Sequence, residues 1–270
     1  MRIGYVSLNV SDLRRSLDFY CKVLGFKIVG NPTDGRALLS AEDGPKLVEL
    51  QQRESLPERR AGLYHFALLL PDRKYLADML LNLNENMDRV QFDGMADHLV
   101  SEAIYIRDPD SNGIEIYRDR PRSEWKWNEG RIEMATIKLD TDDLLKESTA
   151  GGWRGMPPRT TIGHVHLHVR NLQKALNFYR DIVGLDFTAT YPGAYFFSAG
   201  GYHHHIAANT WLGTTIPQAS ADKIGLNHFG IELLDQSEIE RTIKHIPVSV
   251  TNGFVQDPDG IRIKLYSKQA

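Results

Sequence analysis

The sequence runs through the same pattern twice, and this internal repeat constrains the fold more than any other feature. In each copy a strand-like segment leads into a helical segment with a Phe-Tyr pair and a glycine five residues after the tyrosine. Farther along, each copy has a second apolar segment containing His-Phe, and then an Asp-Pro-Asp turn before a last strand-like segment. The matching segments are 3–26 and 161–185, 63–70 and 226–233, and 106–117 and 255–266. Self-similarity over this length indicates a repeat architecture.

Each copy divides again into two shorter units, which have the order strand, helix and three strands. In residues 3–10 apolar and polar side chains alternate, as in a half-buried strand. Apolar residues then recur at helical spacing between a capping Asp12 and a terminating Gly25. Similar patterns predict strands at 26–30, 36–40, 46–51, 63–70, 89–92, 102–107, 113–118, 163–169, 187–191, 194–199, 203–210, 226–233, 247–249, 252–256 and 261–266, and helices at 13–24, 72–84, 172–182 and 236–244. The prediction is an α+β protein of four βαβββ units.

Length and composition bound the remaining choices. The chain has 270 residues, enough for an N-terminal domain (1–120), a linker (121–160) and a C-terminal domain (161–270). We expect Trp125 and Trp127 to anchor the linker. A net charge of −3 gives no sign of a nucleic-acid or membrane-surface partner, and no segment is apolar enough to span a bilayer. Because Cys21 is the single cysteine, no internal disulfide can form, and we expect a cytoplasmic protein.

Taken together, the Phe-Tyr helices, the His-Phe strands and the Asp-Pro-Asp turns resemble the vicinal oxygen chelate superfamily, which includes glyoxalase I, bleomycin-resistance proteins and type I extradiol dioxygenases. Four units in one chain are most similar to the Bacillus-type catechol 2,3-dioxygenases. The resemblance implies that units pair within each half of the chain into two domains. Each domain would be a cupped mixed sheet with helices outside, and its first and last strands would offer metal ligands to the cup.

In the first half, the positions that this fold turns into the cup are Tyr5, Glu49, His65 and Glu115. The set resembles the metal quartet of glyoxalase I, with a tyrosine in one position. A buried His65–Glu115 hydrogen bond, a core tyrosine and an exposed Glu49 are the alternatives without a metal. The resemblance also places a proton-transfer pair, His98 and Tyr105, in this half.

In the second half, His164 and His228 match the two histidine ligands of extradiol dioxygenases. The carboxylate position of those enzymes is Lys264, which cannot donate a lone pair when protonated. In the run 203–205, His204 best matches their acid/base histidine, and His205 is the alternative, as a third nitrogen ligand. A solvated edge strand would also explain this run.

Three functions fit these residues. The first is a ring-cleaving dioxygenase that uses Fe(II) and O2 on a small aromatic substrate of the catechol or hydroquinone type. The second is a glyoxalase-like isomerase or lyase, for which Zn, Ni, Co or Mn could replace iron. The third is a metal-free protein that binds an aromatic ligand, which Lys264 and Phe254 favour. We favour the first function. The chain can form a homo-oligomer. The sequence leaves open which half of the chain carries the site.

Overall fold

A computed structural model describes residues 1–42, 44–245 and 253–267. The first half contains β1 (Arg2–Val10), α1 (Leu13–Asp18), β2 (Lys27–Thr33), β3 (Arg36–Ser40), β4 (Lys46–Gln52), β5 (Gly62–Leu69), α2 (Arg73–Glu85), β6 (Gln91–Asp97), β7 (Ser101–Arg107) and β8 (Gly113–Asp119). The linker contains β9 (Trp127–Asn128), β10 (Arg131–Ile132) and α3 (Thr141–Leu145). The second half contains β11 (Thr161–His168), α4 (Leu172–Leu176), β12 (Asp186–Tyr191), β13 (Ala194–Ser198), β14 (Ile206–Asn209), β15 (Gly225–Leu233), α5 (Gln236–His245), β16 (Phe254–Gln256) and β17 (Arg262–Ser267).

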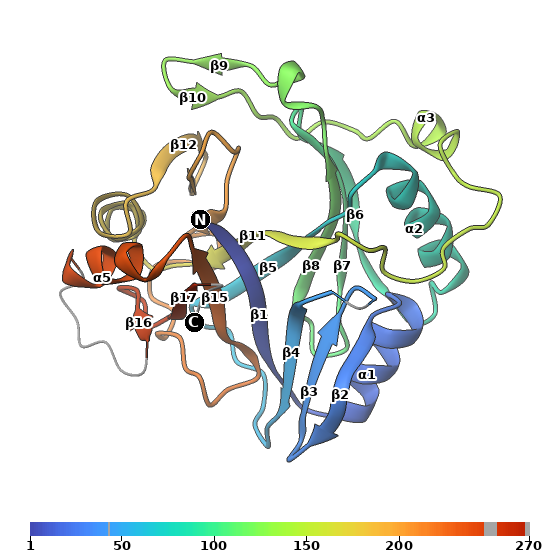
Figure 1. The fold of residues 1–270 in the computed structure, drawn as a ribbon, viewed down its shortest axis with the longest axis horizontal. Coiled ribbons are helices and arrows are strands. Elements are labelled where there is room, and N and C mark those ends of the chain that lie inside the picture. Colours follow the sequence, from blue (N-terminus) through green and yellow to red (C-terminus); the bar gives the residue numbers. More distant parts are fainter. Residues whose placement is uncertain (43, 246–252, 268–270) are drawn as a thin grey trace.

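Two large mixed sheets organise the molecule, and each takes strands from both halves of the chain (Figure 1). The first sheet has the order β16-β17-β15-β1-β4-β3-β2. The second sheet has the order β12-β13-β14-β11-β5-β8-β7-β6. The central contacts are antiparallel pairs of first strands, β1 with β15 and β11 with β5. The expected pairing of units within each half is therefore wrong. The first unit shares a sheet with the fourth, and the second shares a sheet with the third.

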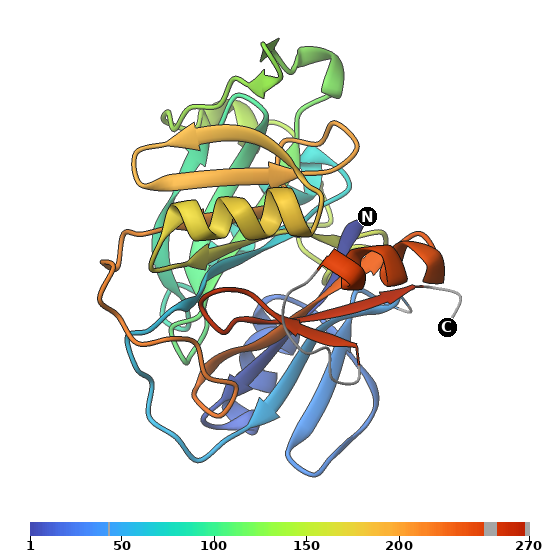
Figure 2. The ribbon, with the colours of Figure 1, turned by 90° about the vertical axis from the view of Figure 1, so that its left-hand side faces the viewer.

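One large hydrophobic cluster takes side chains from both sheets. Val6, Phe66, Val165 and Phe229, one from each first strand, are fully buried members of one cluster of apolar side chains. Strands β1, β5, β11 and β15 are buried over much of their length, which suits strands at the centre of a sheet. In Figures 1 and 2 the helices lie on the outside of these strands.

The repeated motifs meet in space, and this contact holds the two units of each half together. Helix α1 continues into a π-helical turn at Phe19–Val23, and the Tyr20 hydroxyl there donates to the Asp108 carboxylate at 3.0 Å. In the second half, the Tyr179 hydroxyl donates to Asp257 at 2.9 Å from an equivalent π-helical turn. The Phe-Tyr pair and the first aspartate of Asp-Pro-Asp therefore recur because they are hydrogen-bonded partners.

Most predicted elements are present, and the differences are local. The predicted strand 203–210 begins only at Ile206, so the three histidines before it lie in the loop between β13 and β14. The predicted strand 247–249 lies outside the described residues. In the linker, Trp125 is buried and donates its indole N–H to the Arg120 carbonyl, as expected of an anchor, whereas Trp127 is half exposed. In the part of the chain that is described, no helix has the length and hydrophobicity to cross a membrane.

Candidate active site

Three buried side chains converge in the sheet that the second and third units build. His65 on β5 and His164 on β11 each place Nε2 3.0 Å from Oε2 of Glu115 on β8. The two Nε2 atoms are 3.3 Å apart. Among the described residues, this is the one group of three or more histidine, cysteine or acidic side chains whose ligand atoms lie this close together. The set combines ligands that the sequence had suggested for different halves.

The pairing of three adjacent strands creates this convergence. Strand β5 lies between β11 and β8, and the register sets Ala67 opposite both His164 and Glu115. His65 lies two residues before Ala67, so it projects from the same face of the sheet. Between Ile162 and His164 the register shifts by one residue at Gly163. The site therefore depends on a strand pair that joins the first half of the chain to the second.

The donor set fits a divalent metal ion. Three donor atoms at right angles, each about 2.1 Å from an ion, lie about 3.0 Å apart, close to the separations here. Burial raises the pKa of Glu115, but His164 and His65 outweigh burial and hold it well below its usual range. Burial also lowers the pKa of His65, which favours the neutral imidazole. A carboxylate and neutral imidazoles are the protonation states that bind metal.

A cavity of about 390 Å³ opens onto this cluster, and both His65 and Glu115 line it. That volume lies in the range of small-molecule sites. Much of its wall is apolar or aromatic, including Tyr64, Met95, Phe196 and Trp211. The cup that the resemblance implies is therefore present, and two of the three converging side chains line it.

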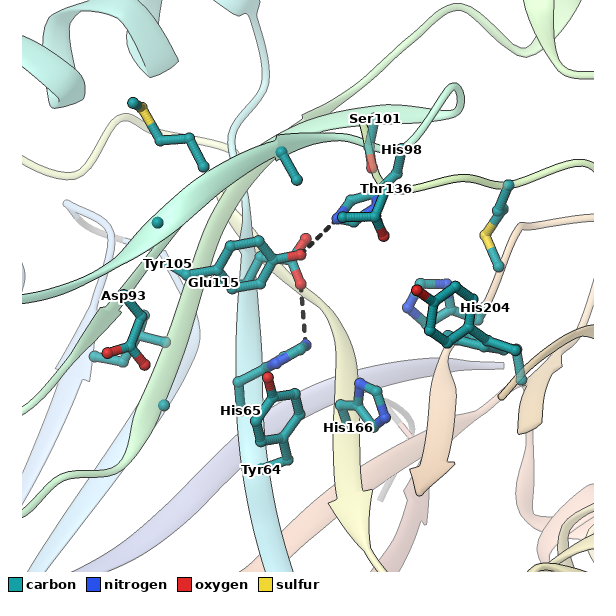
Figure 3. A pocket seen from close by; sticks show the side chains of 18 of the residues that line it. Tyr64, His65, Asp93, His98, Ser101, Tyr105, Glu115, Thr136, His166 and His204 are labelled. Atoms are coloured by element: carbon teal, nitrogen blue, oxygen red, sulfur yellow. Dashed lines mark hydrogen bonds and ion pairs between the residues drawn. The ribbon is translucent and has the colours of Figure 1, made fainter. Parts of the chain in front are cut away.

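The three residues predicted to transfer protons also line the cavity. The His98 ring nitrogen Nε2 is 2.7 Å from the Tyr105 hydroxyl, and the two lie on the same wall as Glu115 (Figure 3). His204 lies across the cavity, and its ring centroid is 4.1 Å from that of His164. Burial lowers the pKa of His204 well below its usual value, so the ring is neutral.

His203 and His205 occupy different surroundings. The His205 Nδ1 atom is 3.1 Å from the Ser198 hydroxyl and accepts the Ala199 backbone N–H, so this ring does not join the cluster and the all-nitrogen alternative is wrong. His203 is fully buried. The alternative of a solvated edge strand is also wrong, because the run lies in a buried loop.

The first sheet has positions equivalent to these three ligands, but different side chains occupy them. Tyr5 and His228 lie where the second sheet has His164 and His65, and Lys264 lies where it has Glu115, by the same register. The Tyr5 hydroxyl is 3.1 Å from Nε2 of His228. Neither residue joins a ligand cluster within the described chain, so the predicted quartet and the predicted second-half pair do not form.

Glu49, another member of the predicted quartet, is paired with two basic side chains. Its carboxylate accepts from Arg36 at 3.0 Å and from Lys46 at 2.8 Å. Its side chain is buried, so the alternative of surface exposure is wrong. With two ion pairs, this carboxylate stabilises the first sheet and does not extend the site in the second.

Comparison with known proteins agrees with this geometry. A family model described as the glyoxalase/bleomycin resistance protein/dioxygenase superfamily matches residues 2–116 and 161–246. The chain is 44% identical over 270 residues to a catechol-2,3-dioxygenase of Bacillus subtilis (strain 168), an alignment that covers 95% of this chain and 93% of the relative. The chain belongs to this superfamily.

One further relative in sequence and one solved structure are also similar to this chain. A lactoylglutathione lyase of Escherichia coli O157:H7 is 27% identical over 129 residues, which cover 44% of this chain and 94% of that protein. The crystal structure of glyoxalase I from Zea mays superposes with a TM-score of 0.60 at 16% identity, covering 99% of this chain and 92% of that one.

Within this superfamily fold, a close approach of backbone and tyrosine suggests a prediction for Gly163. A Cβ atom on Gly163 would lie 1.7 Å from the Tyr117 hydroxyl oxygen, and one on Gly4 would lie 1.7 Å from that of Tyr266. We expect both alanine variants to lose about 1–3 kcal/mol of unfolding free energy, because the tyrosines must move. Only Gly163→Ala should weaken metal binding, since Gly163 precedes His164. Denaturant unfolding and metal titration measure the two effects, and equal metal affinities in both variants would contradict the prediction.

Proposed function

We propose that this chain is an Fe(II)-dependent extradiol dioxygenase that cleaves the ring of a catechol or a related hydroquinone. The convergence of His65, His164 and Glu115 on one point beside an aromatic-walled cavity carries the proposal. Two histidines and one carboxylate are the facial set of non-haem Fe(II) oxygenases, which leaves coordination positions open for substrate and dioxygen. The Bacillus subtilis relative, named a catechol-2,3-dioxygenase, supports the same reaction.

The side chains around the cavity suit this chemistry. When bound, the ferrous ion would act as a Lewis acid and would offer open coordination positions to the diol and to dioxygen. His204 is neutral, so it can accept a proton from a substrate hydroxyl. On the opposite wall, the Tyr105 hydroxyl is held by His98, and its oxygen can accept a hydrogen bond from a substrate hydroxyl. The aromatic side chains, including Tyr64 and Trp211, can pack against a flat ring.

The donor count favours oxygenase chemistry over a glyoxalase-like isomerase. The quartet that would resemble glyoxalase I does not form, because Tyr5 and Glu49 lie in the other sheet. The three donors that do converge leave more positions open than four would. We further propose that the protein works in the cytoplasm, which its single free cysteine suits.

The proposal is tested with protein purified without oxygen and loaded with Fe(II). We expect oxygen uptake and a yellow ring-fission product from at least one member of a panel of catechols and hydroquinones. Glu115→Gln should abolish both signals, since an amide is a weak ligand for the ion. Turnover that persists without oxygen and with Zn(II) would instead support the isomerase. A failure of the whole panel in iron-loaded protein would contradict the dioxygenase.

A further inference from the structure

A chain of hydrogen bonds leads from His204 away from the cavity. The Nδ1 atom of His204 is 2.8 Å from Nδ1 of His203, and Nε2 of His203 is 2.8 Å from Oδ1 of Asp119. Asp119 ends β8, the strand that carries Glu115, whereas the two histidines lie in the loop between β13 and β14. The chain therefore links the two halves of the protein behind the cavity wall.

Aromatic rings enclose the middle of this chain. His203 has no exposed surface, and the centroid of its ring is 4.0 Å from that of Tyr202 and 5.2 Å from that of Trp125. Trp125 belongs to the linker, which covers the loop at this point. A ring held in this way cannot rotate to find other partners, so the hydrogen bonds at its two nitrogens are set by the fold.

The direction of these bonds follows from the groups themselves. An ionised carboxylate only accepts hydrogen bonds. Nε2 of His203 therefore carries a proton and donates a hydrogen bond to Asp119. With one proton on each ring, the other nitrogen of His203 has a lone pair. Nδ1 of His203 therefore accepts, and Nδ1 of His204 donates to it. A neutral His204 whose proton is on Nδ1 has its lone pair on Nε2.

We propose that Asp119 and His203 are positioning residues that fix the tautomer of His204, so that its Nε2 lone pair is available to the cavity. This inference rests on the function proposed above, in which His204 accepts a proton from a substrate hydroxyl. The opposite tautomer would place an N–H on Nε2 and could not accept that proton. The carboxylate thus acts on the reaction through two imidazoles, without touching the substrate.

The test compares two substitutions at one position. In Asp119→Asn, the amide oxygen can still accept the proton of His203, so the tautomers should stay as in the wild type. In Asp119→Ala the acceptor is lost, and His204 should populate the form protonated on Nε2. Two-bond ¹⁵N–¹H correlation spectra of ¹⁵N-histidine-labelled, metal-free protein report which nitrogen of each ring carries a proton. His204→Phe identifies the His204 signals by their disappearance.

The expected spectra show Nε2 of His204 unprotonated in the wild type and in Asp119→Asn, and partly protonated in Asp119→Ala. In iron-loaded enzyme, kcat of Asp119→Ala should fall about 10- to 100-fold, the range for outer-shell partners, with little change in KM. Asp119→Asn should keep most of the wild-type kcat. A wild-type His204 protonated on Nε2, or identical spectra in Asp119→Ala, would overturn the inference. Because the spectra need no turnover, they decide it even if no catechol is cleaved.

Discussion

His65→Ala is expected to lose its bound metal and its ring-cleaving activity, whereas His228→Ala keeps both. His65 supplies one of three converging ligand atoms. The equivalent His228 contacts Tyr5, in a sheet where the acid is replaced by Lys264. Loss of an outer-shell partner costs roughly 10- to 100-fold in metal affinity or activity, and loss of a direct ligand should cost more. Metal content after dialysis and kcat/KM of the iron-loaded proteins provide the measurement.

The two histidine variants form a matched pair. Both side chains are more than nine-tenths buried, on equivalent first strands, and each packs against neighbouring aromatic rings. A similar fall in melting temperature in both metal-free variants would show that the difference in metal content is not a folding defect. Metal loss in His228→Ala but not in His65→Ala would place the site in the first sheet and contradict the assignment.

His204→Phe is expected to lower kcat by about 10²- to 10⁴-fold, the usual contribution of a general acid or base, while the metal stays bound. The substitution keeps an aromatic ring against His164 and Phe196 but removes the nitrogen that would accept the substrate proton. Stopped-flow or steady-state oxygen uptake with the best catechol gives kcat, and metal analysis of the same sample gives the occupancy.

His205→Asn is the control for this loop. The His205 Nδ1 atom accepts the Ala199 N–H, and the asparagine oxygen can replace it, so kcat should remain close to that of the wild type. If His205→Asn lost as much activity as His204→Phe, the effect would reflect the conformation of the loop. If His204→Phe kept its activity, another group would have to accept the proton.

Local patterns in the sequence predicted the elements and most of the reactive residues. Helical spacing and capping located α1 and α4, and strand alternation turned His65 and Glu115 to the same side of their sheet. His98, Tyr105 and His204 were expected from the resemblance, and all three line the cavity. These features depend on short segments, in which each residue's neighbours along the chain decide its environment.

The partners of each strand could not be predicted in the same way. Alternation shows which face a side chain points from, but not which strand lies beside it, and an antiparallel pair such as β5 with β11 joins segments about a hundred residues apart. One signal was present in the sequence. The second half has Phe254 and Lys264 where the first has Tyr105 and Glu115, so two histidines and an acid can meet only if a histidine of the second half joins the first half's strands. The link from Asp119 to His203 had no such signal.

The pairing of β1 with β15 and of β5 with β11 bears on how such a chain evolves. When a gene doubles in length, its product acquires two equivalent junctions between the copies, each able to hold an ion. Selection needs to preserve only one. The junction of β5 with β11 has kept two imidazoles and an acid, whereas the junction of β1 with β15 now presents a phenol, an imidazole and an ammonium group. Two separate, identical subunits could not diverge in this way, because every mutation would alter both of their junctions at once.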